Sequence, residues 1–299
     1  MEYVFKTQNI TKIYKNKQVL KDVNIGVKKG EIYGLIGKNG AGKTTLMKIL
    51  TGIIYPTSGK VTINESEDLC AERKKIGSLI EQPSFYQSFS ATKNLKLFAT
   101  LFSVSYDEIP KVLELVGLSE TGKKRVGKFS LGMKQRLGIA IAMLGNPEIL
   151  VLDEPINGLD PEGIKDIRDL LIKINKERGT TILISSHLLD ELSKIATTYC
   201  IIDNGTIIEE LSKEEFEKKS GLYLKIVCNN LSDAQELLIK NYADIVVKIE
   251  GNELHIFNHT DLSTQISKLL VTNGFEVSEF SLAKSGLEDY FIEKLSSAE

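Results

Sequence analysis

Residues 32–45 read IYGLIGKNGAGKTT and are the most informative stretch of the chain. Its apolar first half is typical of a buried strand, its middle is a glycine-rich loop, and a helical pattern begins near Lys43. In such a loop the backbone N–H groups turn inward around an anion, and the amino end of the helix adds its positive dipole. The stretch therefore predicts a loop that binds the phosphates of a nucleoside triphosphate.

The polar residues of this loop have predicted tasks. Lys43 is expected to place its charge on the β- and γ-phosphate oxygens, Thr44 to ligate Mg²⁺, and Thr45 to reach the α-phosphate. A chance glycine-rich turn would have no use for Gly-Lys-Thr in fixed order at a helix start. The residues expected to bind the nucleotide are Gly37, Lys38, Asn39, Gly40, Ala41, Gly42, Lys43, Thr44 and Thr45.

Composition narrows the class of protein. A chain of 299 residues suits two domains, and 38 basic against 40 acidic residues give no basic surface, so nucleic acid is not an expected partner. The three cysteines, Cys70, Cys200 and Cys228, form no C-x-x-C pair, which favours reduced thiols over a disulfide frame or a zinc site. The chain shows neither a signal segment nor a run that could span a bilayer, so it is expected to be cytosolic by itself.

Alternating strand and helix patterns predict an α/β fold with a mainly parallel sheet. The expected strands are residues 3–10, 19–27, 31–36, 76–80, 149–153, 181–185 and 198–203, and the expected helices are 43–51, 92–102, 106–116, 131–144, 161–177 and 188–196. The first two strands, joined by polar residues 15–18, are expected to form an antiparallel hairpin. Residues 92–144 show helical patterns only, which predicts a helical lobe.

The pattern changes beyond a charged stretch at residues 212–220. From residue 222 onward it predicts a βαββαβ ferredoxin-like unit followed by a closing helix. His255 and His259 are expected in a strand and a turn, so they are not expected to form a metal pair, and the expected role of this unit is dimer packing or regulation. The predicted domains are 1–212 and 222–299, with a linker at 213–221.

Two carboxylates close the apolar strand 149–153. Asp153 is expected to hold Mg²⁺ through water, and Glu154 to polarise the water that attacks the γ-phosphorus. An exposed acidic strand end is the simpler interpretation, but it is weak beside a phosphate-binding loop. His187 follows a strand that is expected beside the Asp153 strand, so its ring can reach the γ-phosphate.

Together these motifs resemble the ATP-binding subunit of ABC transporters over residues 1 to about 212. The resemblance implies a P-loop ATPase domain with an antiparallel β subdomain and a helical subdomain at about residues 85–145. It also implies that Glu154 is catalytic, that Asp160 lies in the D-loop, that His187 is the switch histidine and that Tyr14 stacks on adenine. The family signature Leu-Ser-Gly-Gly-Gln reads FSLGM at residues 129–133, and Ser130 and the Gly132 amide are implied to clasp the γ-phosphate bound by a partner subunit.

A second departure from the family lies where its Q-loop glutamine stands. Counting back from Tyr86 places Glu81 there, with Gln82 as the other candidate. Glu81 can still approach Mg²⁺ and the attacking water, although it brings a full negative charge. Both departures, and the closing residues 287–291, resemble the subgroup that exports bacitracin or lantibiotic peptides for self-protection.

The resemblance implies an ATPase that dimerises head to tail with itself or a paralogue and binds ATP with Mg²⁺. It would drive a separate membrane permease, from the inner face of the membrane, to expel an antimicrobial peptide. The permease is expected to touch residues 85–89, whose aromatic rings could equally form core for the helical lobe.

Two other functions remain open at this point. A soluble ABC ATPase of translation or DNA repair usually carries two ATPase units, coiled coils or basic surfaces, and one of iron–sulfur assembly would leave residues 222–299 without a role. A small-molecule kinase would need other tasks for the signature, Asp160 and His187.

Overall fold

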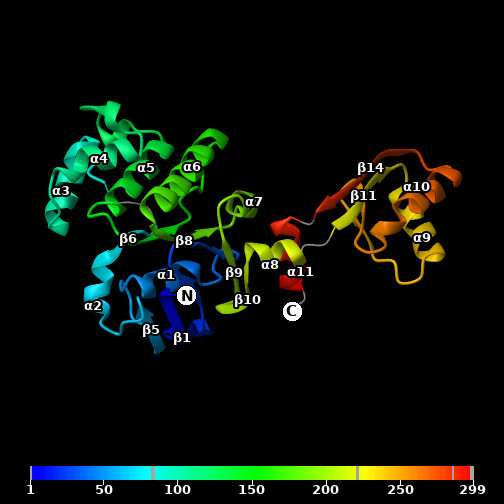
Figure 1. Cartoon of the computed structure of the whole chain (residues 1–299), viewed down its shortest axis with the longest axis horizontal. Helices are drawn as coiled ribbons and strands as arrows, with labels where there is room; N and C mark the ends of the chain where they lie inside the picture. The colour runs from blue at the N-terminus through cyan, green and yellow to red at the C-terminus, as the bar shows by residue number, and fades with distance from the viewer. Residues whose placement is uncertain (1, 82–84, 220–221, 285, 297–299) are drawn as a thin grey trace. The chain divides into compact units, whose positions relative to one another are not determined.

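The computed structural model describes residues 2–81, 85–219, 222–284 and 286–296. Contacts divide it into two compact units, of which the first ends at Lys213 and the second begins at Glu214. Figure 1 labels their helices and strands. Within the described residues, no helix is both long enough and apolar enough to cross a bilayer.

A six-stranded sheet forms the centre of the first unit, in the order β10-β9-β4-β8-β7-β6. All neighbours are parallel except β10 and β9. Its strands are β4 (Ile32–Ile36), β6 (Ile76–Leu79), β7 (Ile149–Asp153), β8 (Thr181–Ser186), β9 (Thr198–Asp203) and β10 (Thr206–Ser212). Strands β4, β7 and β8 are buried along their whole length, which explains their unbroken apolar runs. Their carboxyl ends meet at one edge, where ligands bind in open α/β sheets.

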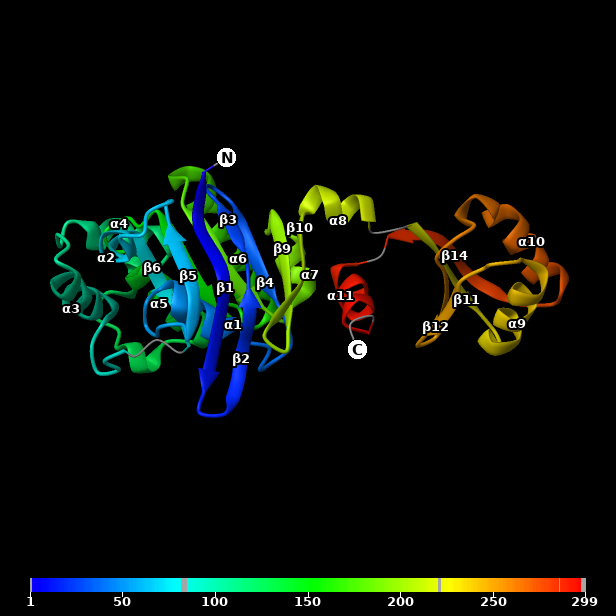
Figure 2. The same cartoon turned by 90° about the horizontal axis from the view of Figure 1, so that it is seen from below.

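A second, antiparallel sheet contains β1 (Tyr3–Tyr14), β2 (Lys17–Val23), β3 (Gly26–Lys28) and β5 (Ser58–Ile63). The long strand β1 runs through it in Figure 2. The predicted hairpin is confirmed, because β1 pairs antiparallel with β2. The prediction of one strand over residues 19–27 was wrong: the Asn24 side chain donates to the Asp22 carbonyl and bonds with Asn9, and this turn separates β2 from β3.

Helices cover both faces of the central sheet. Helix α1 (Lys43–Leu50) shares one core with both sheets of the first unit, whereas α3 to α6 lie on the opposite side of the central sheet (Figure 1). Residues 92–144 are helical as predicted, but they remain part of the first unit. The other elements are α2 (Leu69–Glu72), η1 (Arg73–Lys75), α3 (Ala91–Phe102), α4 (Glu108–Leu115), η2 (Ser119–Thr121), η3 (Val126–Lys128), α5 (Leu131–Ala142), α6 (Pro161–Arg178) and α7 (Leu189–Ser193).

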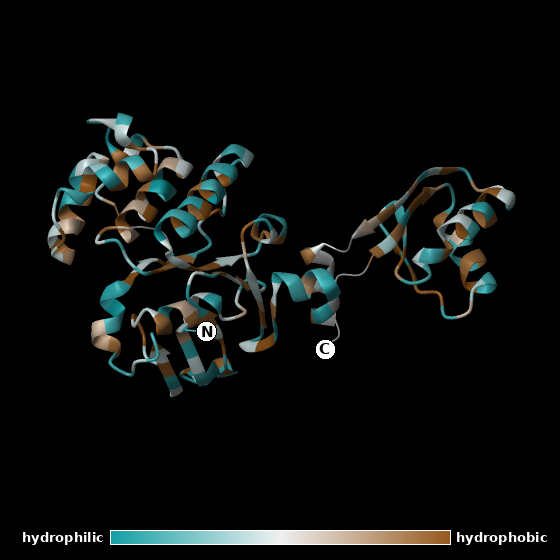
Figure 3. Ribbon diagram, viewed as in Figure 1, coloured by the Kyte–Doolittle hydropathy of each residue, from teal (hydrophilic) through white to brown (hydrophobic). Residues whose placement is uncertain are grey.

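The second unit has the predicted βαββαβ element order and an antiparallel sheet in the order β12-β13-β11-β14. Its elements are α8 (Lys213–Lys219), β11 (Leu222–Cys228), α9 (Leu231–Asn241), β12 (Val247–Glu250), β13 (Glu253–Ile256), η4 (Thr260–Leu262), α10 (Ser263–Thr272), β14 (Val277–Lys284) and α11 (Leu287–Ser296). Helices α9 and α10 share a separate apolar core with the sheet. In Figure 3 hydrophobic residues follow the strands of each unit and hydrophilic ones the outer helix turns. Each unit therefore carries its own core.

Candidate functional site

The phosphate loop is shaped by glycines at the end of β4. Gly42, the residue before α1, has φ of 111°, a conformation that side chains disfavour. A side chain at Gly37 would meet the carbonyl oxygen of Ile202 at 2.4 Å, so only glycine fits there. The loop residues 38–45 line a hollow of about 230 Å³ together with Val19 and Glu154. The predicted loop thus stands at the amino end of a helix, open to a ligand.

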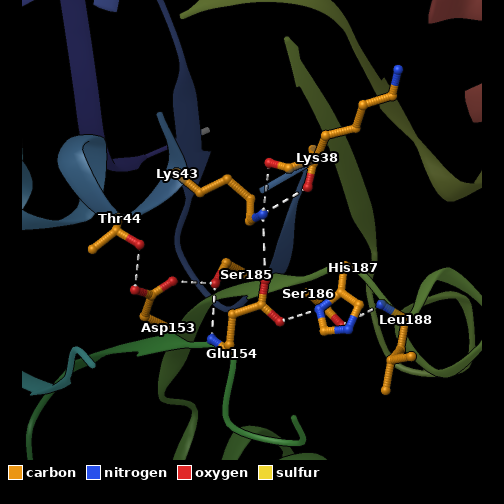
Figure 4. A network of polar contacts seen from close by, with 10 residues as sticks. Lys38, Lys43, Thr44, Asp153, Glu154, Ser185, Ser186, His187 and Leu188 are labelled. Carbon is orange, nitrogen blue, oxygen red and sulfur yellow. Dashed lines mark hydrogen bonds and ion pairs between the residues drawn. The ribbon is translucent and has the colours of Figure 1, made fainter. Parts of the chain in front are cut away.

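Lys43 lies at the centre of this loop and is only 5% exposed. Its ammonium donates to the carbonyl oxygens of Gly37 at 2.6 Å and Lys38 at 3.3 Å. It also lies 3.3 Å from Glu154 Oε1. Figure 4 shows the Lys38 side chain pointing away from this group. The loop carbonyls therefore hold one buried cation against the carboxylate that ends β7.

Asp153 is fixed by two hydroxyl groups. Thr44 Oγ1 donates to Asp153 Oδ2 and Ser185 Oγ donates to Asp153 Oδ1, both at 2.6 Å. Ser185 reaches it because β7 and β8 are parallel and place these two residues side by side. Sequence reasoning missed the role of Ser185, although the expected alignment of the two strand ends carried the signal.

Glu154 lies between Lys43 and His187 (Figure 4). Its backbone N–H donates to Ser185 Oγ at 2.9 Å, and its Oε2 is 2.6 Å from His187 Nδ1. Its Oε1 is buried and, within the described residues, its partner is the Lys43 ammonium, in an ion pair without hydrogen-bond geometry. This oxygen can therefore still accept a hydrogen bond from a ligand or water while Lys43 balances its charge.

The donors at this edge fit a hard divalent cation. The Thr44 hydroxyl and the Asp153 carboxylate are in direct contact. The next residue, Glu154, adds an oxygen, Oε1, that accepts no hydrogen bond from the described residues. Oxygen donors of these kinds are the ligands that Mg²⁺ takes beside phosphates. The residues present therefore fit the expected metal ion.

Glu81 follows β6, the strand beside β7. Its backbone has φ of 62°, which is unusual for glutamate, and its carboxylate contacts Lys48 Nζ on α1 at 2.5 Å. Glu81 lines a hollow of about 560 Å³ together with Asp153 and Glu154. The alternative candidate, Gln82, lies outside the described residues.

The signature residues open onto a different hollow. Ser130 caps α5 by accepting from the Met133 N–H, and Asp160 caps α6 by accepting from the Gly163 N–H. Ser130, Gly132 and Asp160 line a hollow of about 450 Å³. The structure thus brings Lys43, Thr44, Asp153, Glu154 and His187 together and places this second group elsewhere on the same unit.

Several predicted contact residues lie at the surface. Tyr14 ends β1 and is exposed, with the Lys12 ammonium 4.9 Å from its ring centroid. Tyr86 and Phe89 are also exposed and stack on each other with centroids 5.3 Å apart. These two rings therefore do not belong to the core of the helical lobe.

Comparison with known proteins gives consistent results. Residues 20–157 match the family model described as ABC transporter. The chain is 41% identical to the bacitracin transport ATP-binding protein BcrA of Bacillus licheniformis, over 98% of this chain and 97% of that one. It is 44% identical to the lantibiotic transport ATP-binding protein SrtF of Streptococcus pyogenes, over 74% of this chain and 96% of that one. A dimeric bacterial ABC transporter cassette, MJ0796, is similar in structure, with a TM-score of 0.63 and 28% identity over 70% of this chain and 98% of that one.

Proposed function

The chain belongs to the ABC transporter family as an ATP-binding, ATP-hydrolysing subunit, and we propose that it powers export of an antimicrobial peptide of the bacitracin or lantibiotic type. The observation that carries this proposal is the pairing of a complete phosphate-loop site with similarity to BcrA along nearly the whole chain. A soluble ABC ATPase of translation, repair or iron–sulfur assembly is not favoured, because the similar proteins are transport proteins.

The proposed chemistry follows from the contacts around Glu154. Lys43 and the loop amides bind the phosphates, and Thr44 with Asp153 hold Mg²⁺, which when bound neutralises charge on the phosphate oxygens. Glu154 Oε1, which forms an ion pair with Lys43 but accepts no hydrogen bond from the described residues, accepts one from the attacking water. His187 fixes the other oxygen of the same carboxylate and so orients it.

We propose that hydrolysis needs two subunits, either two copies of this chain or this chain and a paralogue. Ser130, Gly132 and Asp160 share a hollow that does not include Lys43, so each group is a half-site. The dimeric state of the similar cassette supports a head-to-tail pairing in which each signature completes the site of the other subunit.

Mixing two defective variants tests the composite site. Ser130→Arg should block pairing, and Lys43→Ala should block nucleotide binding, so each alone should be nearly inactive. Their mixture should recover activity, because one composite site of the heterodimer contains neither defect. Full activity of Ser130→Arg alone would contradict a shared site.

The permease is proposed to contact the exposed rings of Tyr86 and Phe89. They lie close in sequence to Phe85 and Gln87, which line the hollow that also contains Glu154. A membrane protein bound there would place this subunit at the inner face of the cell membrane.

The second unit is proposed to be an accessory or dimerisation domain. It has its own sheet and core, and the match to SrtF accounts for 96% of that protein but only 74% of this chain. The similarity to BcrA covers 98% of this chain and so includes the second unit, which supports an accessory role shared with that protein.

A deletion strain tests the transport function. Removal of the coding sequence should sensitise the host to bacitracin or to a lantibiotic, but not to a non-peptide antibiotic. The wild-type sequence should restore resistance and Glu154→Gln should not. Unchanged sensitivity to every peptide, with ATPase activity intact, would exclude peptide export.

A further inference from the structure

Among its polar contacts with the edge of the central sheet, helix α1 makes two that lie one helical turn apart. Thr44 contacts Asp153, and Lys48, four residues later and on the same helix face, contacts Glu81. Asp153 ends β7, and Glu81 lies two residues beyond β6, the neighbouring strand. One helix face therefore fixes two acidic residues at the same edge of the sheet.

The acidic residues of this edge have different partners. Asp153 accepts two hydroxyl groups and Glu154 faces Lys43. The remaining carboxylate, Glu81, has Lys48 as its ion-pair partner. Because bound ATP brings further negative charge to the same edge, an uncompensated Glu81 would repel it.

We propose that Lys48 is a positioning residue that neutralises Glu81 beside the nucleotide site and releases its carboxylate to metal-bound nucleotide. The inference rests on the proposed function, because it assigns a task at the ATP site. The side chain of Glu81 is 64% exposed, whereas that of Lys48 is 25% exposed. Ion pairs with this much exposure are weak, so a bound cation can compete for the carboxylate at small cost.

This arrangement makes nucleotide binding depend on the metal in a defined way. With Lys48 present, Glu81 repels metal-free ATP little. Without Lys48, the full charge of Glu81 acts on metal-free ATP, whereas Mg²⁺ offsets it in the metal complex. Loss of Lys48 should therefore widen the difference between the affinity for metal-free ATP and the affinity for its Mg²⁺ complex. Loss of the Glu81 charge should narrow this difference.

The test measures the affinity of the whole chain for a slowly hydrolysed fluorescent ATP analogue, once with Mg²⁺ and once with a chelator. Lys48→Met keeps the apolar stem and removes the charge. It should raise the ratio of the dissociation constant with chelator to that with Mg²⁺ about 1.5-fold to fivefold, the range expected for an exposed ion pair. Lys48→Arg should restore the wild-type ratio, and Glu81→Gln should lower it.

Two controls separate the ion pair from a general charge effect. Lys74→Met removes an exposed lysine near the opposite end of β6 and reports the loss of one charge. Adding Lys48→Met to Glu81→Gln should change the ratio no more than Lys74→Met does. An equal effect of Lys48→Met with and without the Glu81 carboxylate would overturn the inference, as would an effect no larger than that of Lys74→Met.

The proposed function fails separately from this inference. If the unaltered chain binds the analogue and Glu154→Gln stops turnover, an unmoved ratio removes only the role of Lys48. If the unaltered chain does not bind the analogue, the proposed nucleotide site itself is wrong.

Discussion

Each unit of the molecule holds a histidine against glutamate, and the two arrangements differ. In the first unit His187 is 38% exposed and bonds one oxygen of Glu154, whose other oxygen pairs with Lys43 but accepts no hydrogen bond among the described residues. In the second unit His255 is 8% exposed, and its ring nitrogens lie 3.3 Å from Glu250 and 3.1 Å from Glu253. The centroid of the His255 ring also lies 4.4 Å from that of the Tyr223 ring.

The side chains around His255 are linked to one another by ion pairs. Lys225 Nζ lies 2.7 Å from Glu253 and 3.5 Å from Glu279. The hydrogen bond from Lys225 lowers the pKa of the Glu253 carboxyl most, and the hydrogen bond from His255 lowers it further. These groups satisfy one another, as expected for a structural network on a sheet face. A functional site is therefore marked less by the number of its polar groups than by an oxygen that can still accept a hydrogen bond from a ligand.

The strongest test exchanges a carboxylate for an amide in each arrangement. Glu154→Gln should keep ATP binding but lower turnover about a hundredfold to a thousandfold, since the amide cannot act on the attacking water. The matched change Glu253→Gln should leave turnover unaltered. Phosphate release from the two variants measures both effects, and equal losses would remove the distinction between site and network.

Each unit has a lysine with several oxygen partners: Lys43 contacts two loop carbonyls and Glu154, and Lys225 contacts Glu253 and Glu279. Replacing these two lysines is the next test. Lys43→Met should weaken ATP binding about tenfold to a hundredfold, because charged hydrogen bonds to phosphate are lost. Lys225→Met should leave ATP affinity unchanged and lower only the stability of the second unit. Equilibrium titration with ATP decides, and wild-type affinity in Lys43→Met would contradict its assignment.

Replacing the two histidines should show the same contrast in turnover, but with a smaller effect. His187→Ala removes one hydrogen bond to the charged Glu154, and turnover should fall about tenfold. His255→Ala should reduce the thermal stability of the second unit with no change in turnover per folded molecule. If turnover per folded molecule fell more in His255→Ala than in His187→Ala, the interpretation would be reversed.

The sequence predicted the phosphate loop and both carboxylates because their residues are adjacent in the chain and in fixed order. It also placed His187 correctly, since β8 lies beside β7. Sequence reasoning missed Ser185, although the expected alignment of β7 and β8 pointed to it, and it could not reveal Lys48, whose partner is 33 residues away and meets it only after the helix and strands are packed. A lysine on an amphipathic helix carries no local sign of such a task.

The two strands that sequence reasoning omitted have a related cause. Residues 58–63 begin with Ser-Gly-Lys, which is typical of a turn, and β5 gains its ladder only from β1. Residues 206–212 lead directly into the charged stretch, and β10 pairs only with β9 at the sheet edge. Edge strands depend on a partner more than on their own pattern.

The last prediction uses the cysteines as reporters of the two units. Burial raises the pKa of the Cys200 thiol, in the core of the first unit, to about 12. Burial also raises the pKa of Cys228, in the core of the second unit. Since only thiolate reacts with an alkylating reagent, Cys200 should react at mildly alkaline pH only when its unit opens. Cys228, which lines a surface hollow, should react more slowly than the exposed Cys70.

Adding ATP and Mg²⁺ should slow the labelling of Cys200, because a ligand that binds the folded first unit lowers the population of its open form. The labelling of Cys228 should keep its rate, because the proposed nucleotide site lies wholly in the other unit. Mass spectrometry of the labelled peptides over time gives both rates in one sample, and Cys70→Ser removes the fast background. If nucleotide slowed Cys228 as much as Cys200, the two units would open together, and the contrast between an incomplete site and a separate closed network would no longer describe independent regions.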